Sequence, residues 1–238
     1  MNQWLGLESK YRAATSADKD PIRHNVLLPE ILYLVGNVKG LAVVDVGCGP
    51  GYLISALARF LPRRLVASDI SEEMVASAIS NTPDAEPMLL DITKQNLPAK
   101  EFDLITCIMV VHSIDDLSSC IRNLASGLVC SGRLIIAIPH PCFHFEQAQI
   151  NRWSNYSGTP PVGQSSKRQS YFLNNRLKNR FGTPCVEIEM IHRPISEYVE
   201  AFFQAELSIT ALREPGPHDT KPWINKPPFL LLAGQKKL

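Results

Sequence analysis

The sequence has no excess of charge of either sign. Its 24 Lys and Arg residues are nearly balanced by 23 Asp and Glu residues, so the formal net charge is +1 at pH 7. A protein that binds nucleic acid over its whole surface, or one with an acidic tail, would carry a large charge of one sign. Both classes are therefore excluded, although a local charged patch is not.

Long apolar runs are also missing. The longest are pieces such as LIIAI and FLLLA, far below the roughly 20 residues that span a bilayer. The first twenty residues mix charged and polar side chains and lack the apolar core of a secretory signal. The sequence predicts a cytoplasmic protein with no membrane partner.

Paired cysteines are a third absence. Cysteines at 48, 107, 120, 130, 142 and 185 lack the spacing of a disulfide scaffold, so we expect reduced thiols. In the stretch HPCFH, the alternating residues His140, Cys142 and His144 could face one metal ion. A structural zinc site needs a fourth ligand, and the usual partner pair is missing. We therefore expect no metal.

Apolar strands alternate with amphipathic helices along the chain. Near-continuous apolar runs are typical of strands buried on both faces of a parallel sheet, and Ser71 is a suitable N-cap for one of the helices. Strands are expected at 41–47, 64–69, 86–92, 102–111 and 132–139, and helices at 51–61, 72–80, 117–128 and 196–206. The alternation predicts an α/β fold with a doubly wound parallel sheet.

The length and the 45% apolar content suit one large domain over residues 1–238. Within it we expect an N-terminal helical cap (1–40), a cofactor-binding core (41–139), a lid or substrate insertion (140–195), and a C-terminal helix and strand pair (196–238). The insertion is assigned because about 55 residues of weak periodicity are uncommon in a compact domain unless they carry function. The strand pair, at 207–215 and 229–237, could close the sheet with an antiparallel edge.

The stretch VVDVGCGPGYL, residues 43–53, joins the first strand to the first helix of this core through a glycine-rich turn. Gly47, Gly49 and Gly51 have the spacing G-x-G-x-G, whereas a dinucleotide-binding turn has G-x-G-x-x-G. Pro50 also removes one backbone donor that a pyrophosphate would use. The turn predicts a ligand close to the backbone that is not a dinucleotide.

Acids follow at the ends of the next two strands. Asp69 ends the strand at 64–69, where one carboxylate can accept from both hydroxyls of a ribose, and Asp91 could accept from an adenine amino group. The spacing therefore indicates a nucleoside. Taken singly, Gly47 could be a turn glycine, Asp69 a helix cap and Asp91 a turn residue.

These segments together resemble the class I S-adenosylmethionine-dependent methyltransferases, especially the group that acts on small molecules. The resemblance rests on VVDVGCGPG, ASDIS, LLDIT, FDLITCIMVVHSIDD and SGRLIIAIP, in this order. It implies a Rossmann-like sheet of seven strands, mostly parallel with an antiparallel last strand, and helices on both faces. It also implies that S-adenosyl-L-methionine is the cofactor.

The resemblance assigns positions along the cofactor. The glycines would lie against its methionine part, Asp69 would bind the ribose, Ile70 and Ile92 would enclose the adenine, and Asp91 would hold the adenine amino group. Tyr11 resembles an N-terminal tyrosine that covers the methionine end. The full set of expected cofactor residues is Tyr11, Asp45, Gly47, Cys48, Gly49, Gly51, Asp69, Ile70, Met74, Asp91, Ile92 and Ile108.

The acceptor end is less defined. MVVHSIDD replaces the Asn/Asp-Pro-Pro-aromatic motif of methyltransferases that act on nucleic-acid bases and protein amides, which counts against those acceptors. The segment 147–186 has no acid but six cations, namely Arg152, Lys167, Arg168, Arg176, Lys178 and Arg180. It is either a solvated lid or a surface for an anionic acceptor or an RNA backbone, and its interleaved aromatics would suit a planar substrate.

Three histidines are candidate general bases, in the order His140, His112 and His192. His140 follows the strand at 132–139 directly, which in a parallel sheet carries it to the edge where ligands bind. His192 lies in IHRPISEYVEAFFQAE, which resembles a segment beside the acceptor pocket of small-molecule members. An imidazole can remove a proton near neutral pH, although each histidine could equally be structural.

We expect an enzyme that transfers the methyl group of S-adenosylmethionine to an oxygen, nitrogen or carbon atom of a small molecule. An RNA or peptide methyltransferase that uses the basic segment is one alternative, and a non-catalytic regulatory protein that binds the cofactor is another. A nicotinamide dehydrogenase disagrees with the glycine spacing. The sequence leaves the acceptor and the oligomeric state open.

Overall fold

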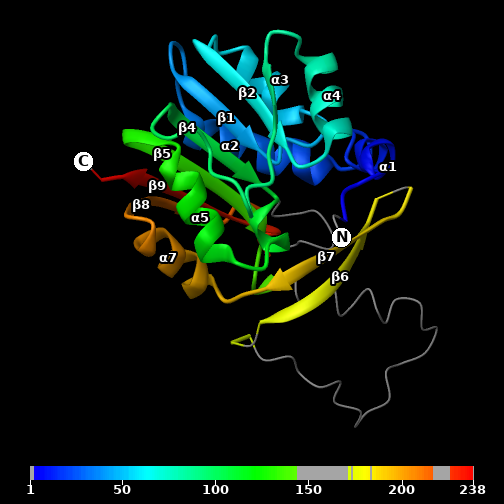
Figure 1. Ribbon diagram of the computed structural model, residues 1–238. Helices are drawn as coiled ribbons and strands as arrows, with labels where there is room; N and C mark the ends of the chain where they lie inside the picture. Colours follow the sequence, from blue (N-terminus) through cyan, green and yellow to red (C-terminus); the bar gives the residue numbers. More distant parts are fainter. Residues whose placement is uncertain (1–2, 144–170, 173, 183, 217–225, 238) are drawn as a thin grey trace, which may run out of the picture.

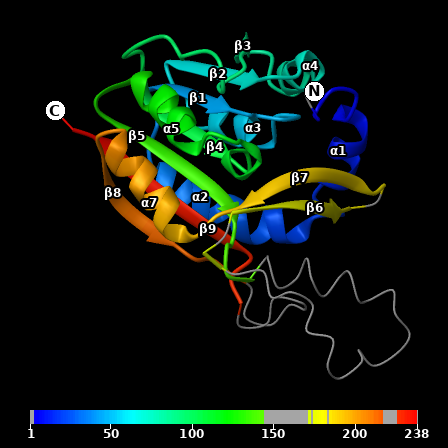
Figure 2. The same ribbon diagram turned by 60° about the horizontal axis from the view of Figure 1, so that its bottom comes forward.

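The chain folds around a mixed β-sheet with helices on both faces, and a small second sheet lies beside it (Figures 1 and 2). The computed structural model describes residues 3–143, 171–172, 174–182, 184–216 and 226–237. Within these residues no helix has both the length and the apolar character needed to cross a membrane.

Seven strands make up the central sheet. They are β1 (Ala42–Val46), β2 (Arg64–Asp69), β3 (Glu86–Leu89), β4 (Phe102–Ile108), β5 (Leu128–Pro139), β8 (Leu207–Arg213) and β9 (Phe229–Lys236). Their order is β3-β2-β1-β4-β5-β9-β8. The pairs among β1 to β5 are parallel, whereas β9 is antiparallel to both β5 and β8. The predicted seven-stranded sheet, mostly parallel with an antiparallel last strand, is confirmed, with β9 lying inside β8 rather than at the edge.

Helices cover both faces of this sheet. They are α1 (Glu8–Ala14), η1 (Arg23–Leu27, a π-helical turn), α2 (Leu28–Val35), α3 (Tyr52–Ala58), α4 (Glu72–Asn81), η2 (Val111–Ser113, a 3-10 turn), α5 (Leu117–Ser126) and α7 (Ile195–Gln204). One buried cluster joins α2, α3 and α4 to the sheet through Ile31, Leu53 and Ala78. Another joins α5 and α7 to it through Ile121 and Phe202. The doubly wound arrangement follows from these two apolar layers.

Local sequence sets the helix ends. The Ser71 hydroxyl accepts from the Met74 N–H (3.4 Å) at the start of α4, as predicted. The Asp116 carboxylate caps α5 in the same way through Ser119 N–H (2.9 Å). The helix predicted at 51–61 ends earlier, at Ala58, because the chain turns at Leu61 with a φ of +52° before it reaches Pro62.

Two strands are shorter than predicted at their carboxyl ends. β3 stops at Leu89 because Asp91 begins a turn in which its carboxylate accepts from the Thr93 N–H (3.1 Å). β4 stops at Ile108 because the chain then enters η2. Leu90, Ile92 and Val111, which follow the two shortened strands, nevertheless stay buried.

A β-hairpin was missed in the segment predicted as a lid. β6 (Asn175–Phe181) pairs antiparallel with β7 (Val186–His192), and the two form a separate sheet. The sequence of β7 alternates apolar and acidic residues (VEIEM), and the buried side chains Val186 and Ile188 pack on Ala14 of α1. That alternation is a strand signal. β6 carries no comparable apolar pattern, which is why the pair was not recognised.

Candidate active site

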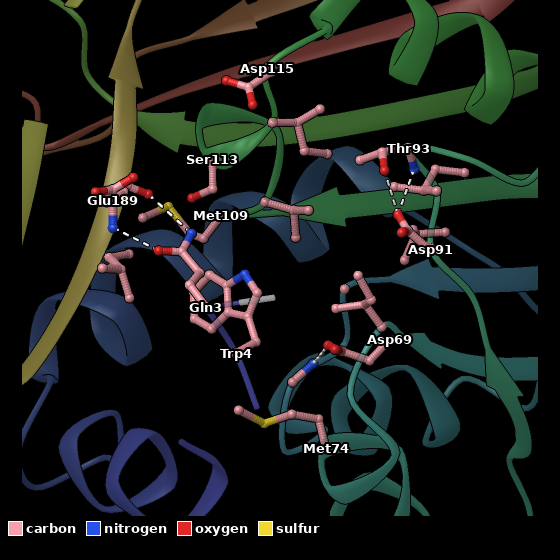
Figure 3. Close-up of a pocket in the computed structure, with 18 of the residues that line it drawn as sticks. Gln3, Trp4, Asp69, Met74, Asp91, Thr93, Met109, Ser113, Asp115 and Glu189 are labelled. Atoms are coloured by element: carbon pink, nitrogen blue, oxygen red, sulfur yellow. Dashed lines mark hydrogen bonds between the residues drawn. The ribbon is translucent and has the colours of Figure 1, made fainter. Parts of the chain in front are cut away.

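A cleft of about 810 Å³ lies at the carboxyl ends of β1, β2 and β4, where a doubly wound sheet binds its ligands. Figure 3 shows Asp69 and Asp91 on the sheet side and Gln3 and Glu189 on the opposite side, with Trp4 between them. Most of the expected cofactor residues line this cleft, namely Tyr11, Gly47, Gly49, Asp69, Ile70, Met74, Asp91, Ile92 and Ile108. The remaining three, Asp45, Cys48 and Gly51, are buried and do not form part of its lining.

The three glycines of the first turn are needed for different reasons. All have a positive φ, of +74° at Gly47, +54° at Gly49 and +92° at Gly51. An added Cβ would lie 2.2 Å from Val110 at Gly47, and 2.7 Å from the Ala78 backbone of α4 at Gly51. These two positions are therefore required by packing of the protein itself. At Gly49 the nearest atom would be on the ring of Tyr11, at 3.7 Å, so this glycine leaves room for a ligand.

Asp69 ties this turn to the next one. Its Oδ2 accepts from the Gly49 N–H (3.0 Å) and its Oδ1 accepts from the Ser71 N–H (2.9 Å). Burial raises the pKa of Asp69, while these backbone hydrogen bonds oppose the rise. Each carboxylate oxygen accepts more than one hydrogen bond, so the side chain can still accept from a pair of hydroxyls in the cleft.

Asp91 is engaged within its own turn. Its Oδ1 accepts from Thr93, and its Oδ2 lies 2.8 Å from Lys94 Nζ. Burial alone would raise its pKa, but Lys94 and Thr93 outweigh that effect and lower the pKa of Asp91. The carboxylate is therefore charged at neutral pH and presents an acceptor to the cleft.

Asp45 and Cys48 lie beneath the turn. Asp45 Oδ1 accepts from the Thr106 hydroxyl of β4 (2.6 Å), and the side chain is 2% exposed. Burial raises the pKa of Asp45 to about 7; Thr106 opposes this change and the Asp69 carboxylate adds to it. Burial also raises the pKa of the Cys48 thiol, which stays neutral and packs in the core.

Arg23 is a buried cation beside this end of the cleft that the sequence did not reveal. Its Nε lies 2.9 Å from Asp20 Oδ2, and its guanidinium lies over the rings of Tyr11 (5.9 Å) and Tyr52 (5.8 Å). The buried Tyr52 hydroxyl has no hydrogen-bond partner among the described residues. Arg23 and Tyr52 lie behind Tyr11 and do not line the cleft themselves, so the Arg23 charge is, among the described residues, the nearest buried cation to the Tyr11 end of the site.

The wall opposite the sheet joins the N-terminal segment to the hairpin. The Gln3 side-chain amide donates to the Glu189 carbonyl (3.2 Å) and accepts from the Glu189 N–H (2.7 Å), as a neighbouring strand would. Tyr11 also packs edge-on against Phe181 of β6, at 5.9 Å between ring centroids. These contacts hold the hairpin over the cleft.

The cations on the hairpin are paired with acids from outside the acid-free segment. Arg176 contacts Asp115 and lies 3.9 Å from Glu189, while Lys178 and Arg180 both contact Glu187. Arg152, Lys167 and Arg168 lie outside the described residues. The local positive field expected from the sequence is thus largely neutralised along β6.

The three histidines come together, but not in the main cleft. His112, His140 and His192 line a second cavity of about 10 Å³. His140 Nε2 lies 2.6 Å from Glu214 Oε1, and its Nδ1 accepts from the Cys142 N–H (3.2 Å). His192 Nε2 lies 3.0 Å from the Tyr171 carbonyl oxygen. His144, the third residue of the metal candidate, lies outside the described residues.

Known proteins share this sequence pattern and architecture. Residues 44–136 match the family model described as a methyltransferase domain. A Haemophilus influenzae protein described as uncharacterized is 24% identical over 91% of this chain and 90% of its own length. The trans-aconitate 2-methyltransferase of Variovorax paradoxus is 35% identical, but the match covers 46% of this chain and 43% of that enzyme. A solved S-adenosylmethionine dependent methyltransferase of Mesorhizobium loti has 20% identity and a TM-score of 0.67, over 87% of this chain and 96% of that one.

These matches and the arrangement of the cleft define an S-adenosylmethionine-dependent methyltransferase. The family match over residues 44–136 and the similar proteins support assignment to class I of these enzymes, with S-adenosyl-L-methionine as the cofactor. The family, the enzyme class and the cofactor predicted from the sequence are therefore confirmed.

The different surroundings of the glycines lead to a first prediction. Gly51→Ala should lower the free energy of unfolding by at least about 3 kcal/mol, because the new methyl group collides with α4. Gly49→Ala should cost only about 1 to 2 kcal/mol, from its positive φ. It should nevertheless weaken S-adenosylhomocysteine binding at least tenfold. Urea unfolding and calorimetry measure both quantities, and unchanged affinity in Gly49→Ala would contradict ligand contact at this turn.

The buried acid leads to a second prediction. In the unfolded chain Asp45 has its ordinary pKa of 3.8, and in the folded protein the pKa is about 7. The unfolded chain therefore loses the proton first as the pH rises, and stability falls between pH 4 and 7. Asp45→Asn keeps an acceptor for Thr106 and should add roughly 2 to 4 kcal/mol at pH 8 but little at pH 4. Denaturant unfolding across this range tests the slope, with the exposed Asp84→Asn as control; an equal gain at both ends would contradict the burial effect.

Proposed function

We propose that this methyltransferase acts on a small-molecule acceptor that binds in the same cleft as the cofactor. The observation that carries the proposal is the continuity of the cleft, which runs from the nucleoside end at Asp69 to the polar wall at Ser113 and Arg176. Its volume of about 810 Å³ falls in the range of roughly 300 to 1,000 Å³ that is typical of small-molecule sites.

The proposed positions of the cofactor follow the cleft residues. Asp69 accepts from the ribose hydroxyls, Ile70 and Ile92 enclose the adenine, and Asp91 accepts from its amino group. The backbone at Gly49 lies against the methionine part, and Arg23 lies beside its carboxylate. S-adenosylmethionine supplies a methyl group on a sulfonium, an excellent leaving group, when it is bound. The chain therefore has mainly to orient the acceptor and exclude water, which Trp4 and the hairpin wall would do.

A relative supports the class of acceptor. The Variovorax enzyme is named for trans-aconitate, a small molecule, and its match covers 46% of this chain. An RNA acceptor is less well supported, because the described part of the basic segment pairs its cations with acids of the protein. Retention of labelled RNA that is lost at high salt would favour that alternative.

The three histidines remain proposed participants in methyl transfer, but their contacts favour a structural role over that of a general base. An Nδ1 that accepts from a backbone N–H places the proton of neutral His140 on Nε2, which then donates to Glu214. The ring thereby links the end of β5 to the chain beyond β8. We propose that this pair holds the floor of the second cavity, and that any base effect on the acceptor is small.

A third prediction concerns the cofactor. The protein should bind S-adenosylmethionine and S-adenosylhomocysteine but not NAD, because the turn lacks the pyrophosphate spacing. Asp69→Ala should weaken both by about 1.5 to 3 kcal/mol, the range for hydrogen bonds to a charged group. Isothermal calorimetry measures these affinities. Binding of NAD alone, or unchanged affinity in folded Asp69→Ala, would contradict the proposed nucleoside site.

A fourth prediction distinguishes a structural role of His140 from a role as general base. If the ring is structural, His140→Ala lowers the free energy of unfolding by about 1 to 3 kcal/mol, because it removes a buried hydrogen-bonded side chain. The pH profile of kcat then keeps its shape. A general base would behave differently, with kcat lower by about 10²-fold at neutral pH and restored at high pH. Steady-state rates between pH 6 and 9, together with unfolding curves, distinguish these results.

A further inference from the structure

Arg176 lies at the acceptor end of the cleft. It stands on β6, lines the cleft, and its side chain is 61% exposed. Its guanidinium binds the carboxylate of Asp115, which lies on the loop after η2, and it also lies 3.9 Å from Glu189 on β7. The described structure thus already holds a carboxylate against this guanidinium, on the side that faces the cleft.

The pair between Arg176 and Asp115 is easily exchanged. The Asp115 side chain is 70% exposed, so both partners are largely solvated. Exposed ion pairs of this kind contribute little to stability. A carboxylate brought into the cleft with an acceptor could therefore replace Asp115 on Arg176 at little cost. The planar guanidinium would bind it through two parallel hydrogen bonds.

Ser113 supplies a second donor on the same loop. It lines the cleft two residues before Asp115, and Figure 3 shows both side chains at the same end of the site. Its hydroxyl is buried and has no hydrogen-bond partner among the described residues. A buried hydroxyl without a partner is unfavourable, and a ligand that bonds to it would remove that cost.

Arg193 fixes the position of this loop. It is 3% exposed, and its Nη2 donates to the carbonyl oxygens of Ile114 and Asp115 (2.8 Å to Asp115). The two clamped residues directly follow Ser113. The loop is therefore held in place before a ligand arrives, which lowers the cost of binding.

We propose that the methyl acceptor carries a carboxylate group, and that this group binds between the guanidinium of Arg176 and the hydroxyl of Ser113. The proposal rests on the small-molecule methyl transfer proposed above. An anionic acceptor is also favoured by the cofactor, because the sulfonium is a cation and attracts an anion that binds beside it. The carboxylate is described here as the group that is recognised, whichever atom of the acceptor receives the methyl.

An amine acceptor makes the opposite demand on these residues. It would bind to Asp115 and Glu189, and Arg176 would repel it. Whether each substitution raises or lowers the rate of methyl transfer therefore distinguishes a carboxylate acceptor from an amine acceptor. Asp115→Asn frees Arg176 for a carboxylate but removes the partner of an amine, and Arg176→Gln does the reverse.

The experiment uses the full chain, labelled S-adenosylmethionine and a small-molecule cell extract separated by anion exchange. Label should enter the retained fraction, and transfer should survive phosphatase treatment of the extract but not amidation of its carboxylates by a carbodiimide. At limiting acceptor, Arg176→Gln should slow transfer at least tenfold and Ser113→Ala at least threefold. Asp115→Asn should speed it, and S-adenosylhomocysteine affinity should stay within twofold in each variant.

Arg180→Gln is the matched control, because Arg180 is on the same strand and in an ion pair but does not line the cleft. Its transfer rate should stay within twofold of the unsubstituted chain. Transfer into the unretained fraction only, loss of activity after phosphatase, or a slower Asp115→Asn would each overturn the carboxylate proposal. Absence of transfer into any fraction, with cofactor binding intact, would instead contradict the proposed small-molecule function.

Discussion

The carboxylate of Asp69 is the constraint on which the cofactor end of this enzyme depends. One side chain accepts from the backbone of the glycine turn after β1 and from the backbone at the start of α4. The parallel register of β1 and β2, in which Val46 lies opposite Ser68, brings the two turns to the same level. A buried acid can then hold both turns at a fixed separation, and the remaining lone pairs face the cleft. The site is assembled by the fold before any ligand contributes.

The cofactor half was predictable because its signals are local. A buried strand, a glycine turn and a terminal acid repeat within a short stretch, and the sheet then carries each terminal acid to one edge. Even in this half, the sequence pattern alone predicted the same role for Gly47, Gly49 and Gly51. Gly47 and Gly51 are required because Val110 and Ala78 pack against them, whereas Gly49 faces open space near Tyr11. These three neighbours come from other elements of the fold.

The acceptor half was less predictable because its contacts are long-range. From the sequence, Arg176 is one cation of a basic segment. In the structure it is paired with Asp115, which lies 61 positions earlier in the chain. His140 follows a strand as expected, but its ring is hydrogen-bonded to Glu214, which lies 74 positions later. The hairpin was hard to recognise because only β7 alternates apolar and polar residues, whereas β6 has two apolar residues, Leu177 and Phe181. Charge counts and strand ends cannot reveal pairings of this kind.

The position of β9 bears on how the chain assembles during synthesis. β8 precedes β9 along the chain but lies outside it in the sheet, so it touches β5 only through a strand that is made later. As the chain emerges, β5 has an open edge and β8 has no partner until residues 229–236 insert between them. Such an unpaired edge is a template for non-native pairing. β9 therefore has to match two registers, one against β5 and one against β8, before this half of the sheet is complete.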